Sequence, residues 1–181
     1  MNKALRYAGI SGIFVVVLSF VSLGLFALRF VGVRSGETVM VGIIGNIVYL
    51  IFAIPFIYGF ILLGEKTKNR ILVYSSYLGL IVMVPSTLIS LFFEFYPASE
   101  LLIGILGIVI SLLTGLVGLA LGAGLMKLKK EFGNLATAAG ILEICCSLLF
   151  LTIILYPLGA FIGTIAGILE VALLLKAAKK F

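Results

Sequence analysis

Residues 101–126 read LLIGILGIVISLLTGLVGLALGAGLM, an apolar run without a charged side chain. A helix needs about 20 mainly apolar residues to cross the hydrocarbon core of a bilayer, and this run is long enough. The whole chain of 181 residues has the same character, with 63% hydrophobic and 11% charged residues. Soluble domains carry roughly 25% charged residues. We therefore predict an all-α integral membrane protein.

The chain divides into six such runs, separated by short segments of charged, polar or turn-forming residues. The predicted spans are residues 8–28, 39–64, 71–95, 101–126, 135–155 and 158–175. The first run follows Lys3 and Arg6 but is too long for the apolar core of a signal peptide, so we read it as a span. No connection is long enough for a soluble domain. Residues 1–181 are therefore expected to form a single integral membrane domain, a six-transmembrane-helix bundle.

Lysine and arginine are distributed unevenly between the two sides of this predicted bundle. With the N-terminus inside, only Arg29 and Arg34 fall on the outer side. The cations on the inner side are Lys3, Arg6, Lys66, Lys68, Arg70, Lys127, Lys129, Lys130, Lys176, Lys179 and Lys180. This bias follows the positive-inside rule and predicts an N-in/C-in topology. We expect a multi-pass protein of the plasma membrane of a prokaryote.

Small residues recur at helical spacing on three of the spans. In lipid, helices associate mainly where small residues let their backbones approach closely. The sets are Ala136, Ala139 and Gly140 in the fifth span, Gly159, Gly163, Ala166 and Gly167 in the sixth, and Gly107, Ser111, Gly115, Gly118 and Gly122 in the fourth. Because only Tyr156-Pro157 separates the last two spans, we expect an antiparallel hairpin in which their small faces approach each other.

A weaker pattern relates two pairs of spans. The second and third spans resemble the fourth and fifth, each pair being joined by a basic turn. This similarity indicates either a tandem hairpin repeat of the same orientation or the chance likeness of apolar sequences.

The phrase Ala-Gly-Ile-Leu-Glu occurs at residues 139–143 and again at 166–170, and each copy places a glutamate inside an apolar run. An intramembrane carboxylate costs about a few kcal/mol and by default suggests an ion or proton pathway. Two nearby carboxylates can share one proton or hold a cation, which makes Glu143 and Glu170 a candidate ion or proton site. The alternative is structural, with a protonated Glu bonded to a neighbouring helix or Glu170 paired with a lysine near the interface. The sequence favours the structural alternative.

Pro55 and Pro85 lie inside the second and third spans, where they free the carbonyl groups of Ile51 and Ile81 from helical hydrogen bonds. We expect nearby polar side chains to satisfy these carbonyls. They are Asn46 in the second span and Ser86, Thr87 and Ser90 in the third. Proline is common in membrane helices, so a tolerated kink is favoured over a gating hinge.

The residue types that most catalytic and metal sites require are missing. The chain has no His, which excludes His-based triads and zinc-binding H-E-x-x-H motifs, and no Asp, which excludes aspartyl intramembrane proteases. It contains no P-loop, G-x-S-x-G or G-x-G-x-x-G motif. Cys145 and Cys146 are adjacent in an apolar run, so we read them as packing residues rather than a disulfide or zinc pair. We predict no enzyme activity, no cofactor, no metal site and no nucleic-acid binding.

The C-terminal half carries an ordered series of short motifs. They are Phe132-Gly133-Asn134-Leu135, Ala139-Gly140-Ile141-Leu142, Leu151-Thr152-Ile153-Ile154-Leu155, and then Glu170 and Lys176. This order resembles a family of small archaeal multi-pass membrane proteins that is catalogued as a domain of unknown function. The resemblance implies a helical membrane fold, and it implies no activity or site residues.

Taken together, these features predict a non-enzymatic accessory protein or self-assembling module that acts through helix packing. Its partners would be the lipid bilayer and either further copies of the chain or a larger membrane complex. The alternative is a small ion- or proton-linked transporter or channel that uses Glu143 and Glu170. A substrate-capturing subunit of a vitamin importer has a similar size, but the chain lacks the Trp, Asp, His and Gln expected in such a pocket.

Overall fold

The structure, a computed structural model, describes residues 2–32, 35–95, 100–152 and 154–181. Over these ranges every regular element is a helix, which confirms the all-α prediction, and six helices are long and apolar enough to cross a membrane. The long helices are α1 (Lys3–Phe30), α2 (Gly36–Lys66), α3 (Arg70–Phe95), α4 (Glu100–Lys127), α6 (Asn134–Leu151) and α7 (Tyr156–Lys180). The short helix α5 (Lys129–Phe132) connects α4 to α6.

Most of the long helices extend one to five residues beyond the predicted spans, and two places differ further. The segment between the fourth and fifth spans forms α5, and its last residue, Phe132, is buried. Helix α6 ends at Leu151, before the predicted end at residue 155. The β-branched residues that follow Leu151 have a low helix propensity, and Pro157 lies in the first turn of the next helix. The predicted break at residues 34–38 is shorter than expected, because Ser35 caps α2 and residues 36–38 form its first turn. Arg34 and residues 96–99 of the predicted breaks lie outside the described residues.

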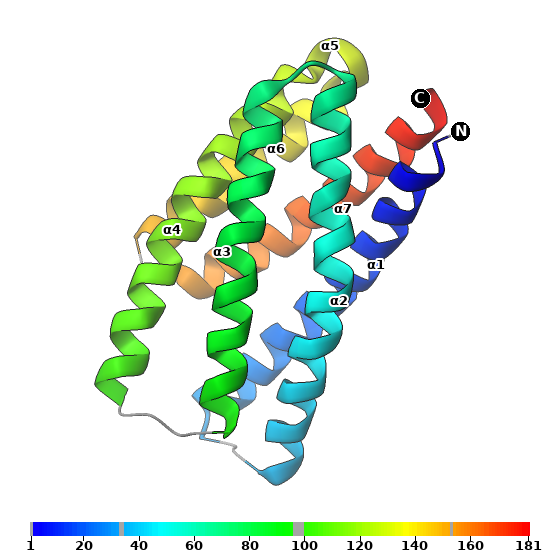
Figure 1. The fold of residues 1–181 in the computed structure, drawn as a ribbon. Helices are drawn as coiled ribbons and strands as arrows, with labels where there is room; N and C mark the ends of the chain where they lie inside the picture. The colour runs from blue at the N-terminus through cyan, green and yellow to red at the C-terminus, as the bar shows by residue number, and fades with distance from the viewer. Residues whose placement is uncertain (1, 33–34, 96–99, 153) are drawn as a thin grey trace.

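The six long helices pack as a closed ring. Each one contacts the next long helix along the chain, and α7 returns to contact α1. Figure 1 shows that both termini, α5 and the turn between α2 and α3 lie at the same end of the bundle. The termini are tied together there, because the backbone N–H of Asn2 donates to the carbonyl of Ala178 at 2.9 Å.

The end of the bundle that holds the termini also holds most of the cations, and we call it the basic end. Its lysines and arginines are Lys3 and Arg6 of α1, Lys66 of α2, Lys68, Arg70 of α3, Lys127 of α4, Lys129 and Lys130 of α5, and Lys176, Lys179 and Lys180 of α7. Arg29 belongs to the far end of α1, and Arg34 lies outside the described residues.

The buried apolar core is concentrated in the half of the bundle nearer the basic end. Its members are Leu5, Ala8, Val15, Ala53, Phe56, Phe60, Leu63, Leu72, Leu125, Leu128, Phe132, Ala136, Ala139, Val171, Leu173, Leu174, Ala177 and Ala178. On every long helix these positions lie on the basic side of the midpoint. Around the outside, large apolar side chains are exposed, as at Met40 (64%) and Ile81 (65%), which suits contact with lipid.

Both helices that contain an internal proline continue through it. The prediction that nearby polar side chains donate to the carbonyls freed by the prolines is wrong. Asn46 donates to the carbonyl of Gly42, and both Ser86 and Thr87 donate to the carbonyl of Met83. Ser90 likewise donates to the carbonyl of Ser86. On a helix, such side chains reach backward by three or four residues. They therefore cannot reach the carbonyls that Pro55 and Pro85 leave free.

The most extensive contact between two helices joins α4 to α6. A Cβ atom added at Gly122 would lie 2.8 Å from the carbonyl oxygen of Gly140, and one added at Gly140 would lie 2.6 Å from that of Gly122. Real Cβ atoms do not approach backbone oxygens so closely. The two helices can therefore pack at this distance only because both positions are glycine.

We expect Gly122→Ala to lower the free energy of unfolding by about 1–3 kcal/mol, because the added methyl group overpacks the contact with α6. The matched control is Gly107→Ala in the same helix, where an added Cβ meets nothing within 4 Å. That control should leave stability unchanged or raise it by up to about 1 kcal/mol through helix propensity. Unfolding of the purified protein with SDS in mixed micelles measures both, and equal stability of the two variants would contradict the packing argument.

Candidate functional site

Glu170 of α7 lies deep inside the bundle. The residue is only 6% exposed, and its Oε1 atom has no hydrogen-bond partner. Within the described ranges it is the one buried side-chain nitrogen or oxygen atom in this condition. A buried polar atom without a partner costs about 1–3 kcal/mol, so native structures rarely keep one without a reason.

Glu143 of α6 is half-buried, and its carboxylate lies against α4. A Cβ atom added at Gly118 would come within 2.8 Å of Oε1 of Glu143. The glycine of α4 therefore leaves the space that the carboxylate occupies. The neighbouring Ser147 does not donate to this carboxylate, because its hydroxyl donates to the backbone carbonyl of Glu143 at 2.7 Å.

The two glutamates belong to the α6–α7 hairpin. The helices are antiparallel, and the thiol of Cys146 in α6 donates to the carbonyl of Gly159 in α7 at 3.1 Å. A Cβ atom added at Gly163 would lie 2.8 Å from Sγ of Cys146, so the residues of α6 before Cys146 lie beside those of α7 after Gly163. The fold thus places Glu143 and Glu170 on the same side of this contact, toward the basic end.

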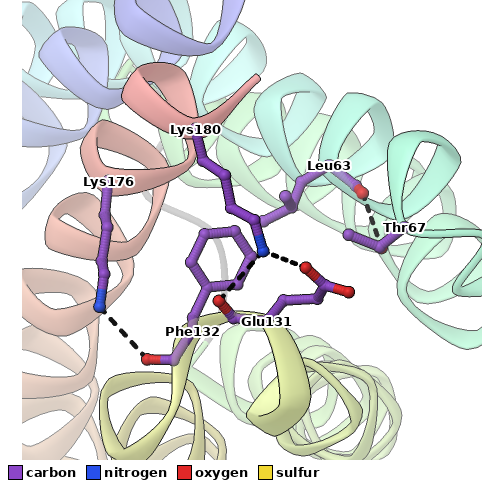
Figure 2. A network of polar contacts seen from close by, with 6 residues as sticks. All are labelled: Leu63, Thr67, Glu131, Phe132, Lys176 and Lys180. Carbon is purple, nitrogen blue, oxygen red and sulfur yellow. Dashed lines mark hydrogen bonds and ion pairs between the residues drawn. The ribbon is translucent and has the colours of Figure 1, made fainter.

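A lysine partner for Glu170 was one sequence-based alternative, and it is wrong. Figure 2 shows that the lysines at the end of α7 reach toward α5 instead. Lys176 donates to the carbonyl of Phe132 at 3.4 Å, and Lys180 forms an ion pair with Glu131. Because α5 lies beside the end of α7, these lysines find partners at the basic end rather than in the membrane interior.

The small residues of the last two spans do not simply face each other. Gly140 packs on α4, as described above, whereas a Cβ atom added at Gly163 would lie 2.8 Å from Sγ of Cys146 in α6. Gly159 also faces α6, near Phe150, and Gly167 faces Val16 of α1. Ala136, Ala139 and Ala166 are fully buried. The small residues of α6 therefore include a contact with α4, whereas those of α7 contact both α6 and α1.

Most other polar side chains within the long helices are bonded to backbone. Ser19 donates to Val15, Ser76 to Leu72 and Thr164 to Ala160, each within its own helix. Ser111 of α4 instead donates across the bundle to the carbonyl of Phe150 at 2.8 Å. Oε1 of Glu170 differs from these groups, because it is the buried side-chain oxygen without a hydrogen-bond partner in the described ranges.

In the part of the chain that the structure describes, no group of three or more His, Cys, Asp or Glu residues is arranged to hold a metal ion. Comparison with known proteins finds no matching family model, curated protein or solved structure. The resemblance noted in the C-terminal half therefore stays a prediction.

Sequence reasoning identified both glutamates but missed Gly118 as the residue that makes room for Glu143. The signal was present, since Gly118 belongs to the small-residue set of α4. The set does not reveal that a carboxylate of α6 lies opposite one of its members.

We expect Glu170→Met to raise the free energy of unfolding by about 1–3 kcal/mol, because it replaces an unpaired buried carboxyl with an apolar side chain of similar length. Glu65→Met, at an exposed position of α2, is the control and should leave stability unchanged. SDS titration of the purified variants measures the change. A loss of stability in Glu170→Met would show that the carboxyl is a structural hydrogen-bonding group.

Proposed function

We propose that this protein is a small proton-linked membrane transporter or channel in which Glu143 and Glu170 hold the proton. The observation that carries the proposal is the buried Oε1 atom of Glu170, which lacks a partner and belongs, like Glu143, to the α6–α7 hairpin. A carboxyl group that served only to bind helices together would use its oxygens in hydrogen bonds. This one keeps an oxygen available.

A proton fits the site better than a large ion does. Two carboxylates near each other inside a membrane repel and are poorly solvated when both are charged. One shared proton removes half of that charge without needing space. The surroundings are small and apolar or already bonded, as with Gly118 and Ser147, so they offer a cation few further oxygen ligands.

The position of the pair along the membrane supports transport. Glu143 lies near the middle of α6 and Glu170 near the middle of α7, at the border of the tightly packed half of the bundle. The apolar core separates the pair from the basic end. We therefore infer that protons reach the pair from the opposite end, and that passage to the basic end requires the core to open.

The proposal includes an orientation. With the basic end in the cytoplasm of a prokaryote, eleven cations lie inside, as the positive-inside rule requires, and both termini are cytoplasmic. The proton entrance then faces the outside of the plasma membrane. The proposed function needs no catalytic residue and no cofactor.

A self-assembling module receives less support from the packing. The small residues that motivated it at Gly118, Gly122 and Gly140 are used between helices of the same chain. Gly104 and Gly107 of α4 are exposed with open space around them, so they are the glycines of α4 that a second copy could reach.

Proton flux tests the proposal directly. The full chain is reconstituted in liposomes that enclose a pH-sensitive dye, and a potassium diffusion potential, negative inside, drives protons inward. We expect the wild-type protein to acidify the interior faster than empty liposomes do. Glu170→Gln and Glu143→Gln should reduce this rate to that of empty liposomes, because an amide cannot carry the proton.

The matched control for this experiment is Glu131→Gln, which removes a carboxylate at the basic end and leaves the intramembrane pair untouched. It should retain the wild-type rate. Wild-type flux in the double variant Glu143→Gln/Glu170→Gln would rule out the proposed role of the pair.

Chemical labelling tests whether a proton is held at the pair. Dicyclohexylcarbodiimide enters the membrane and reacts with protonated carboxyl groups, so we expect it to modify Glu170 or Glu143 and to spare Glu65. Mass spectrometry of the digested protein identifies the labelled residue. Protection by sodium ions at constant pH would indicate a cation site, and a complete lack of intramembrane labelling would contradict a bound proton.

A further inference from the structure

A cavity of about 450 Å³ opens at the basic end, between the α2–α3 turn and the turn that joins α4 to α5. Four cations line it, namely Lys68, Arg70, Lys127 and Lys130. In the described ranges none of the four side chains has an ion-pair or hydrogen-bond partner. The cavity therefore gathers positive charge that the protein itself does not neutralise.

The acidic residue of the cavity wall is already engaged. Glu131 forms its ion pair with Lys180, whose Nζ also donates to the backbone carbonyl of Glu131 at 3.3 Å (Figure 2). Lys180 in turn lies over the ring of Phe132. This arrangement holds the carboxylate toward the end of α7. An anion that enters the cavity would meet four uncompensated cations.

The two walls of the cavity are fixed to each other. The side chain of Asn69 donates to the carbonyl of Gly124 in α4 at 2.7 Å, and its Oδ1 accepts from the backbone N–H of Leu72. A Cβ atom added at Gly124 would lie 3.0 Å from Cα of Leu72, so α3 and α4 approach closely here. This contact keeps the cations of the two turns around one space.

Lys68 occupies a position that a glycine would fill more easily. Its φ is 54°, in the left-handed region. The bonds from the N–H of Lys68 to the carbonyl of Glu65 and from the N–H of Asn69 to that of Gly64 form the Schellman motif that ends α2. Glycine is preferred at this position, and a lysine there accepts backbone strain. Such strain is a reason to look for a functional role of the side chain.

We propose that this cavity binds the phosphate group of an anionic membrane lipid. Guanidinium and ammonium groups form charge-assisted hydrogen bonds to phosphate, and basic pockets between membrane helices bind lipid head groups in this way. The cavity lies at the ends of membrane-spanning helices. One and two turns further along α3, Tyr74 and Tyr77 are 64% and 46% exposed, as expected of aromatic residues at the level of the head groups.

Native mass spectrometry of the full chain in mild detergent tests the proposal. The protein is titrated with phosphatidylglycerol and, separately, with phosphatidylcholine, whose phosphate is neutralised by choline. We expect retention of phosphatidylglycerol in preference to phosphatidylcholine. Arg70→Gln/Lys127→Gln should weaken phosphatidylglycerol binding by about tenfold or more, because it removes two of the four cations.

The matched control is Lys3→Gln/Lys179→Gln, which removes the same charge from the basic end outside the cavity. It should keep the affinity of the wild-type protein. An equal loss in both double variants would mean attraction to the net charge alone and would overturn the site. Displacement of the lipid by glycerol phosphate at equal concentration would assign the cavity to a soluble phosphate and overturn the lipid as its ligand.

Lys68→Gly separates binding from folding. Because glycine suits the left-handed conformation, this variant should melt at a higher temperature than the wild-type protein while it binds phosphatidylglycerol more weakly. Wild-type binding by Lys68→Gly together with wild-type binding by Arg70→Gln/Lys127→Gln would overturn the proposal.

Discussion

The contact between α4 and α6 sets the geometry on which the candidate site depends. Gly122 and Gly140 each lie against the carbonyl oxygen of the other, so the two backbones approach without side chains between them. In lipid, where apolar burial does not drive helices together, such close packing is a principal source of association. The same approach brings the carboxylate of Glu143 against Gly118, one turn along α4. A methyl group at either level would displace both the helix and the acid.

Most polar groups in this protein are hydrogen-bonded within their own helix, and the exceptions mark the two candidate binding sites. Hydroxyl groups inside the helices mostly donate to a backbone carbonyl three or four residues earlier, as Thr164 does, which satisfies them at little cost in lipid. Two features lack such partners in the described ranges. They are the buried oxygen of Glu170 and the four cations around the cavity at the basic end. The first lies in the interior of the helix bundle and the second at its basic end. We propose a proton as the species bound at the first and an anion as the species bound at the second.

Local patterns predict the helices well because each span and each break is encoded by residues near in sequence. Helical spacing also identifies the packing faces, but a face on one helix has two possible neighbours. That is why Gly140 could be assigned to a packing face and yet its partner, α4 rather than α7, could not be predicted. Similarly, the ion pair of Lys180 with Glu131 could not be predicted, because it depends on the short helix α5, which the sequence analysis treated as a connection. The positive-inside rule explains every cation at the basic end as a topology signal. The sequence therefore offers no reason to expect that four of these cations line one cavity.

The unequal packing of the two halves connects the two proposals. The core that closes the basic half is anchored by residues at the very ends of the helices, where Asn69 joins α3 to α4 and the N–H of Asn2 joins α1 to α7. Under the proposed function, a proton that reaches Glu170 passes on only if this half loosens. A lipid phosphate in the cavity would bridge the α2–α3 turn to α4 and α5 and would hold the half closed. Lipid binding and proton passage should therefore oppose each other, since the closed half is the state that the lipid stabilises.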